Sequence, residues 1–147
     1  MTEPNAPRCT RIVVHIDLTD AAIPAVEYAR ILAASLGATL HFLHVVKEPL
    51  SAGWTAELQP FAFPEVQQAM EVEAEQWLDG VIPESEQERF EASLDVETGE
   101  IAEEIIRCAH DHEADLIVVS AKAEGADADM TERLLRKVRC SVLVVRP

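Results

Sequence analysis

The sequence has no long apolar run and contains few glycines and cysteines. Its 147 residues include five glycines and three cysteines. No apolar stretch approaches the length of a bilayer span, and the first residues carry no apolar segment of a secretory signal. Cys9, Cys108 and Cys140 are widely spaced and odd in number, which fits ordinary small residues in a reducing compartment. We therefore expect a cytoplasmic protein with no membrane partner.

Basic residues are scarce as well, and their distribution is uneven. The formal net charge is −15, which argues against a nucleic acid as a partner. Residues 48–106 contain sixteen acids and a single base, Arg89, whereas residues 131–147 carry a net charge of +4. The acidic run from Glu71 to Glu91 is interpreted as a solvated face, with a basic protein partner on this face as the alternative.

Apolar strand-like segments alternate with amphipathic helix-like segments along the chain. Strands are expected at residues 12–17, 39–46, 89–97, 116–119 and 141–145. Helices are expected after each of the first four, because apolar residues recur there at steps of three and four. This order predicts an α/β fold, a three-layer sandwich with a parallel sheet between helices. We expect a single domain over residues 1–147, with residues 1–10 as an N-terminal extension.

Two of the expected strands differ in their patterns. Residues 89–97 alternate apolar and polar side chains, which predicts one wet face and a place at or near an edge of the sheet. Residues 141–145, SVLVV, have neither face polar. The long loop at residues 47–63 holds three aromatic residues, and we expect at least one to pack against the strand ends or a partner subunit: Trp54, Phe61 and Phe63.

The histidines do not form a metal site when they are taken in sequence pairs. His41 and His44 are three apart on a strand and should face opposite ways. His110 and His112 are two apart on a helix and should not converge. Packing or surface roles are therefore expected for both pairs, and no metal site is predicted.

Five blocks in register resemble the universal stress protein family: IVVHIDLTD, ATLHFLHVV, VETGEIAEEI, ADLIVVSA and CSVLVVRP. The resemblance covers nearly the whole chain, from Arg11 to Pro147. It implies a five-stranded parallel sheet of order 3-2-1-4-5, and a dimer. One branch of the family binds ATP and another does not.

The resemblance also places a nucleotide site. Asp17 matches the family's first-strand aspartate, and Val45 matches its adenine-contacting valine after the second strand. Capping or bracing of the loop before the first helix is the other interpretation of Asp17. The nucleotide-binding branch carries G-x2-G-x9-G-[S/T] after the fourth strand, directly after Val119 here. Its glycines and hydroxyl fall, by position, on Ser120, Ala123, Ala128 and Asp129. All three glycines are absent, and the loop is about five residues short.

A loop of this composition is a poor phosphate site. Glycine takes positive φ and turns successive N–H groups toward an anion, and alanine there costs ~1–2 kcal/mol. Each missing charge-assisted hydrogen bond removes ~1.5–3 kcal/mol, from the ~8 kcal/mol of a micromolar site. The pattern therefore indicates a degenerate nucleotide site without a bound cofactor.

Taken together, these features predict a non-enzymatic binding or regulatory protein of the stress response. It would act as a homodimer through the last strand, at Val142, Leu143, Val144 and Val145. The alternative is a sensor that binds ATP or another adenine nucleotide weakly through Asp17 and Val45. An enzyme with a triad of Asp17, His44 and Ser120 is disfavoured, because no nucleophile elbow surrounds Ser120.

Overall fold

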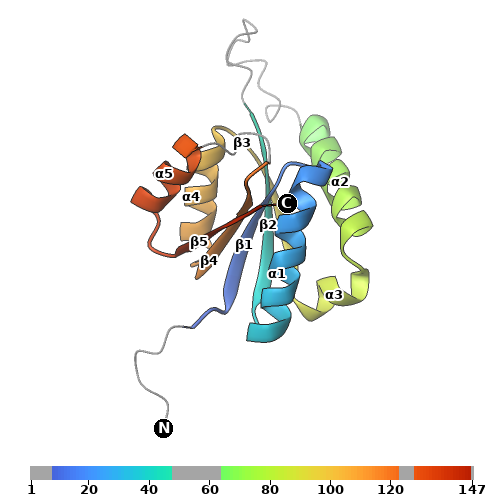
Figure 1. Cartoon of the computed structure of the whole chain (residues 1–147). Helices are drawn as coiled ribbons and strands as arrows, with labels where there is room; N and C mark the ends of the chain where they lie inside the picture. Colours follow the sequence, from blue (N-terminus) through green and yellow to red (C-terminus); the bar gives the residue numbers. More distant parts are fainter. Residues whose placement is uncertain (1–7, 48–63, 123–127, 147) are drawn as a thin grey trace, which may run out of the picture.

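The computed structural model describes residues 8–47, 64–122 and 128–146. Its centre is a five-stranded sheet in the order β3-β2-β1-β4-β5, in which every neighbouring pair is parallel (Figure 1). The strands are β1 Arg11–Ile16, β2 Thr39–Val46, β3 Ser93–Thr98, β4 Leu116–Ser120 and β5 Ser141–Val145. The predicted α/β class and the order 3-2-1-4-5 are both confirmed.

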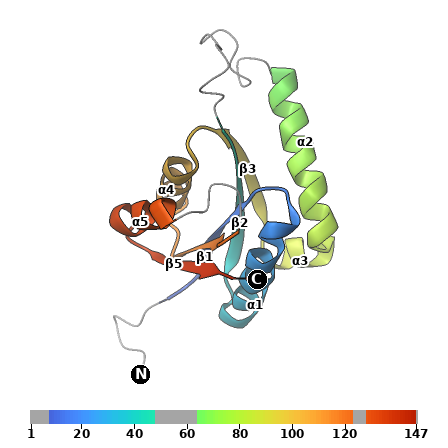
Figure 2. The ribbon, with the colours of Figure 1, turned by 45° about the horizontal axis from the view of Figure 1, so that its top comes forward.

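Helices cover both faces of the sheet. They are the 3-10 turn η1 Asp20–Ala22, then α1 Ile23–Leu36, α2 Pro64–Val81, α3 Glu84–Arg89, α4 Ile101–Asp111 and α5 Ala128–Lys137. Figures 1 and 2 show α1 and α2 on one side of the sheet and α4 and α5 on the other. The carboxyl ends of the strands, where parallel sheets of this kind bind ligands, lie at the top of Figure 1.

The two faces of the sheet form two apolar clusters, because successive strand residues point to opposite faces. Ile12, Val14 and Ile16 of β1 pack in the cluster beneath α1. Val13 packs with Leu43 in the cluster beneath α4 and α5. The central strands are therefore buried on both sides, which explains their continuous β-branched sequence.

The ends of α1 follow from local chemistry. The Thr19 hydroxyl accepts from the Ala21 N–H at 3.2 Å and caps η1, which leads directly into α1. Gly37 ends α1 in the left-handed conformation with φ of 68°, and the Ala38 N–H then donates to the Ala33 carbonyl. The chain is thereby turned into β2.

The expected strand at residues 89–97 was wrong in its first half. Residues 84–89 form the short helix α3, and β3 begins only at Ser93. Pro83 sits before α3, the Gln87 side chain donates to the Ile82 carbonyl, and Phe90 caps the helix through the Glu86 carbonyl. Phe90 is buried by this turn and not by strand alternation. The edge position of the strand is confirmed.

Two strand ends differ slightly from the expected bounds. β1 ends at Ile16, one residue before the expected end, and β4 continues to Ser120. Trp54, Phe61 and Phe63 lie outside the described residues. Among the helices that the structure describes, none is both long and apolar enough to cross a membrane.

Candidate functional site

The crevice at the carboxyl ends of β1 and β2 contains Asp17 and Val45, the two residues through which the resemblance would have an adenine nucleotide bind. Its described walls form a cavity of about 190 Å³ between the two strand ends. The lining includes His15, Asp17, His44, Val45 and Lys47. Small-molecule sites begin at ~300 Å³, so the described part of the crevice is small for a whole nucleotide. The structure does bring Asp17 and Val45 together, as the resemblance implies.

Asp17 braces the turn that leads into the first helix. Its Oδ1 accepts from the Thr19 N–H at 3.0 Å and from the Thr19 hydroxyl at 2.7 Å. This arrangement is an Asx-type turn, in which a side chain organises the backbone two residues later. The bracing interpretation of Asp17 is therefore confirmed, and Asp17 also lines the cavity.

His15 lies at the floor of the same crevice. The ring is 1% exposed, and its Nδ1 has no hydrogen-bond partner among the described residues. Burial lowers the pKa of His15 to about 4, with the nearby His44 acting in the same direction and Asp17 against it. A buried imidazole of this kind is neutral at physiological pH. His15 therefore gives the crevice an uncharged polar floor. The sequence pattern did not identify this residue.

The far side of the crevice is the junction between β4 and α5. Val119 and Ser120 are fully buried at the end of β4. The Ser120 hydroxyl donates to the Ala21 carbonyl at 2.6 Å and accepts from the Lys122 N–H at 3.3 Å. This hydrogen bond joins β4 to η1, so the donor proton of the Ser120 hydroxyl is already used within the fold.

Two further residues of the degenerate motif open α5. Ala128 is its first residue and Asp129 lies in its first turn, and both are exposed. A helix start favours negative charge, and here the chain supplies that charge itself. Ala123 lies outside the described residues. Beside this junction, a cavity of about 500 Å³ is lined mainly by apolar atoms, including Leu135 and Val144.

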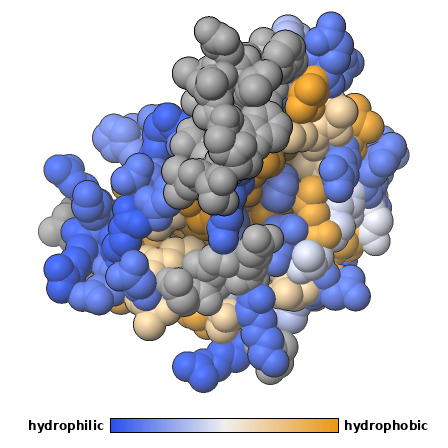
Figure 3. Space-filling model, turned by 90° about the horizontal axis from the view of Figure 1, so that it is seen from above, coloured by the Kyte–Doolittle hydropathy of each residue, from blue (hydrophilic) through white to orange (hydrophobic). Residues whose placement is uncertain are grey.

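Figure 3 looks down on this end of the molecule. Orange and tan hydrophobic residues lie beside the grey atoms in the middle of the view, and blue hydrophilic residues border them on the left. The described surface at this end of the molecule is therefore mixed in hydropathy.

The triad interpretation fails on geometry. His44 donates through Nδ1 to the Ile16 carbonyl at 3.0 Å, and the Ser120 hydroxyl donates to a backbone carbonyl. A serine nucleophile needs its hydroxyl on a general base within ~2.6–3.2 Å. Neither of these two hydrogen bonds joins Ser120 to His44.

The last strand lies at the edge of the sheet opposite β3, as predicted. Val142 and Leu143 are half-buried, Val144 is 36% exposed and Val145 is buried. On the adjacent helix α5, Leu135 is 62% exposed. The edge thus carries exposed apolar side chains next to unpaired backbone groups.

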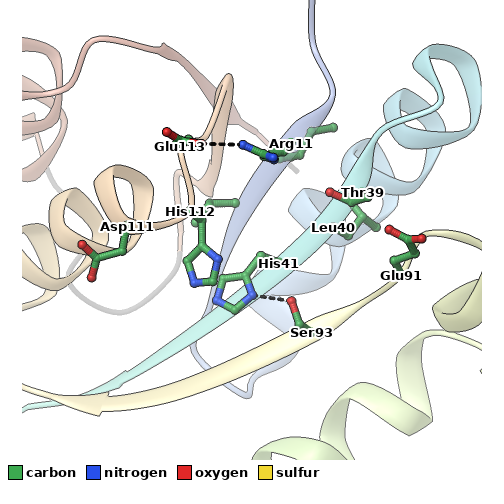
Figure 4. Close-up of a pocket in the computed structure, with 11 residues that line it drawn as sticks. Arg11, Thr39, Leu40, His41, Glu91, Ser93, Asp111, His112 and Glu113 are labelled. Carbon is green, nitrogen blue, oxygen red and sulfur yellow. Dashed lines mark hydrogen bonds and ion pairs between the residues drawn. The ribbon is translucent and has the colours of Figure 1, made fainter.

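A second polar cluster, which the sequence pairs did not reveal, lies near the amino ends of β2 and β3. One histidine from each pair meets here: the rings of His41 and His112 stack with centroids 3.7 Å apart (Figure 4). Both Nε2 atoms approach the same oxygen of Asp95, at 3.0 and 3.3 Å. The signal in the sequence was the i, i+4 spacing of Cys108 and His112, which places both on one helix face.

Two groups in this cluster have shifted pKa values. Burial lowers the pKa of His41, assisted by the neighbouring His112 and opposed by Asp95. Burial raises the pKa of the Cys108 thiol to about 12, and the carboxylates around it, Asp95 first among them, act in the same direction. The cluster is therefore neutral at His41 and protonated at Cys108 when no cation is present.

Comparison with known proteins agrees with this architecture. The universal stress protein family matches residues 9–146. The universal stress protein UspA from Lactobacillus plantarum is 28% identical, with a TM-score of 0.68 over 97% of this chain and 100% of that one. A universal stress protein family member from Burkholderia pseudomallei is 26% identical, with a TM-score of 0.62 over 92% and 95%.

A more distant relative carries a nucleotide. The universal stress protein from Archaeoglobus fulgidus in complex with dAMP is 15% identical, with a TM-score of 0.56 over 95% of this chain and 99% of that one. At this identity the likeness concerns the fold alone. No protein of curated function matches the chain. The family match over nearly the full length, together with the sheet order, shows that this chain belongs to the universal stress protein family.

Proposed function

We propose that the protein is a non-enzymatic, homodimeric regulator of the stress response whose nucleotide site no longer supports phosphate binding. Its family has a stress-response role, and its members are generally not enzymes. The observation that carries the proposal is the carboxylate of Asp129 in the first turn of α5. In this position an anion would otherwise meet the helix N-terminus.

Three features of the crevice support this function. The hydroxyl of Ser120 is held by the Ala21 carbonyl, so it does not face a phosphate as a donor. Asp129 adds repulsion of ~1 kcal/mol per phosphate charge at 4 Å even in bulk water. Ala128 stands where the nucleotide-binding branch has glycine, at the start of a helix. Each feature weakens triphosphate binding independently.

Titration of Mg²⁺-ATP into the purified protein by calorimetry tests the proposal. We expect a dissociation constant in the millimolar range or weaker. The double variant Ser120→Gly with Ala123→Gly should not restore tight binding, because the loop remains short and Asp129 remains in place. A low micromolar dissociation constant for the unmodified protein would refute the proposal.

The dimer is proposed on the edge strand β5. Val144 and Leu135 expose apolar side chains there, and an isologous antiparallel pairing of two β5 strands would satisfy both rows of backbone groups. The bases of residues 131–147 lie at this end, whereas the acids concentrate in residues 48–106. Repulsion between acidic faces is screened beyond ~8 Å at physiological ionic strength. Light scattering should give twice the 16.2 kDa chain mass.

The second candidate function is an adenine-nucleotide sensor. It is favoured by the cavity between Asp17 and Val45 and by the dAMP complex of the Archaeoglobus fulgidus relative. A monophosphate needs fewer phosphate contacts than ATP, so the degenerate junction weakens it less. Titration with AMP distinguishes the two functions: micromolar AMP binding that Asp17→Ala or Val45→Lys weakens would establish the sensor.

A further inference from the structure

Four potential metal ligands converge beneath α4, at the end of the sheet opposite the nucleotide crevice. They are His41 on β2, Asp95 on β3, Cys108 on α4 and His112 directly after α4. One donor atom from each lies within 4.8 Å of the other three. Such a group of two imidazoles, a thiol and a carboxylate has the donor types of tetrahedral zinc centres.

The fold explains why these residues meet. His41 pairs with Ser93 and Leu43 pairs with Asp95 in the β2-β3 ladder, so His41 and Asp95 point to the same face of the sheet. Cys108 and His112 lie one helical turn apart, and the His112 N–H donates to the Cys108 carbonyl at 3.0 Å. α4 packs its Cys108 face onto that sheet face. β2, β3 and the C-terminal end of α4 therefore bring their potential ligands to one place.

The distances within the cluster are close to those of a tetrahedral centre. With metal–ligand bonds of about 2.0–2.3 Å, tetrahedral ligand atoms lie about 3.3–3.8 Å apart. The two histidine Nε2 atoms lie 3.0 and 3.3 Å from Asp95 Oδ2. All four donor atoms lie within 4.8 Å of one another, so no pair needs to contract by more than about 1.5 Å to reach tetrahedral spacing. His112 and Asp95 are partly exposed and are free to make such an adjustment by rotation.

Ser93 holds His41 in an orientation that serves metal binding. Its hydroxyl lies 2.5 Å from His41 Nδ1, the contact that is dashed in Figure 4, and His41 Nε2 then lies 3.0 Å from Asp95 Oδ2. A serine hydroxyl both donates and accepts. It can therefore accept from the Nδ1–H tautomer that leaves Nε2 free for a metal. Partners of this kind behind a histidine ligand orient the ring and raise its basicity.

The charge and access of the cluster also favour a divalent cation. A carboxylate on Asp95 and a thiolate on Cys108 balance two positive charges, and Asp111, Glu97 and Glu104 make the surroundings of Cys108 negative. A cavity of about 340 Å³ opens beside His41 and His112, next to the ion pair of Arg11 and Glu113. Figure 4 shows both rings at this opening.

We propose that His41, Asp95, Cys108 and His112 bind one zinc-class divalent cation per chain in a tetrahedral site. The four protein ligands fill the coordination sphere, which is typical of structural and not of catalytic zinc. The ion would join the edge strand β3 to β2 and to the C-terminal end of α4. Binding releases the thiol proton of Cys108 to solvent. This site is independent of the nucleotide crevice.

Cobalt substitution tests the site directly. The purified, tag-free chain is titrated with Co²⁺ and then with Zn²⁺, and absorption is recorded. We expect intense visible bands of tetrahedral Co²⁺ and a near-ultraviolet thiolate band, both saturating at one equivalent per chain and both displaced by Zn²⁺. Zn²⁺ should also raise the melting temperature. Cys108→Ala should abolish the thiolate band, whereas Cys140→Ala, at a partly buried cysteine outside the cluster, should leave it intact.

Two more variants cover the case in which Cys108→Ala does not fold. His112→Gln changes a side chain that is 38% exposed and should weaken Co²⁺ binding at least tenfold. Ser93→Ala should weaken it about 10- to 100-fold through the orientation of His41. Weak octahedral bands in the unmodified protein, the absence of any Co²⁺ binding, or an unchanged spectrum in His112→Gln would each overturn the proposal. A purely hydrogen-bonded cluster would bind no Co²⁺, and the other two results would place the ion at a different site.

Discussion

The buried His15 should make the stability of the protein depend on pH in a way that one substitution removes. Its ring is 1% exposed, and its Nδ1 has no hydrogen-bond partner among the described residues. Burial lowers its pKa from 6.5 to about 4 in the folded chain. As the pH falls from 6.5 to about 4, the unfolded chain therefore binds a proton here that the folded chain does not.

The magnitude follows from this difference. One pH unit corresponds to 1.36 kcal/mol, so the window between 6.5 and about 4 is worth about 3 kcal/mol. The folded state is free of this penalty above pH 6.5 and carries all of it below about pH 4. This is a large part of the ~5–15 kcal/mol by which domains of this size are stable.

The variant His15→Leu should lack the penalty, because leucine does not titrate. Urea unfolding followed by circular dichroism between pH 7 and pH 4 gives the free energy of unfolding for both chains, at one fixed protein concentration because dimers unfold in a concentration-dependent way. We expect the variant to gain about 3 kcal/mol relative to the unmodified chain across this range. His110→Gln, at an exposed histidine, is the matched control. Parallel pH curves for His15→Leu and the unmodified chain would show that His15 does not lower the stability in acid.

Three other substitutions test the fold and the dimer. Val144→Lys should convert the proposed dimer to monomer or insoluble protein in light scattering. Val72→Lys, at a similarly exposed valine on α2, should leave the oligomeric state unchanged. A dimeric Val144→Lys would count against pairing through β5. Asp115→Asn should be less stable than the unmodified chain at neutral pH and equally stable in acid, because N–H donation, first from Thr10, lowers the pKa of Asp115. The contribution of the carboxylate is present above pH 3.8 and is lost as the pH falls through the lowered pKa. A difference in the free energy of unfolding in urea that stays constant from neutral pH into acid would contradict this. Ile105→Ala should lower the free energy of unfolding by ~2–5 kcal/mol, because Ile105 is fully buried. Ile106→Ala should lower it clearly less, because Ile106 is only half-buried. Equal losses in the two variants would be inconsistent with the observed core.

The fold was largely predictable because its signals are local and repeated. The buried strands read as runs of β-branched residues, and Gly37 marked the end of α1. The strand order came from the resemblance to the family and not from the pattern itself. α3 was missed because the polar run before Phe90 carries no helical apolar face, and its helix depends on Pro83 and a cap at Phe90.

The sites were predictable only in part. Asp17 and Val45 lie at the ends of adjacent parallel strands, which topology alone brings together. The roles of Ser120 and His15 depend on contacts with residues distant in sequence, such as the 2.6 Å hydrogen bond to the Ala21 carbonyl. The cluster of His41 and His112 was hidden for the same reason, since each histidine pairs with one on another element and not with its neighbour in sequence.

The central claim is that the nucleotide site of this chain no longer supports phosphate binding, and the ratio of ATP to AMP affinity tests it most directly. In an intact phosphate loop, two charge-assisted hydrogen bonds to the added phosphates are worth ~3–6 kcal/mol, which is about 100-fold or more in affinity. Calorimetric titrations with AMP and with Mg²⁺-ATP should be run on the same preparation. We expect ATP to bind no more tightly than AMP, whether or not the adenine itself is bound. ATP affinity 100-fold above that of AMP would contradict it.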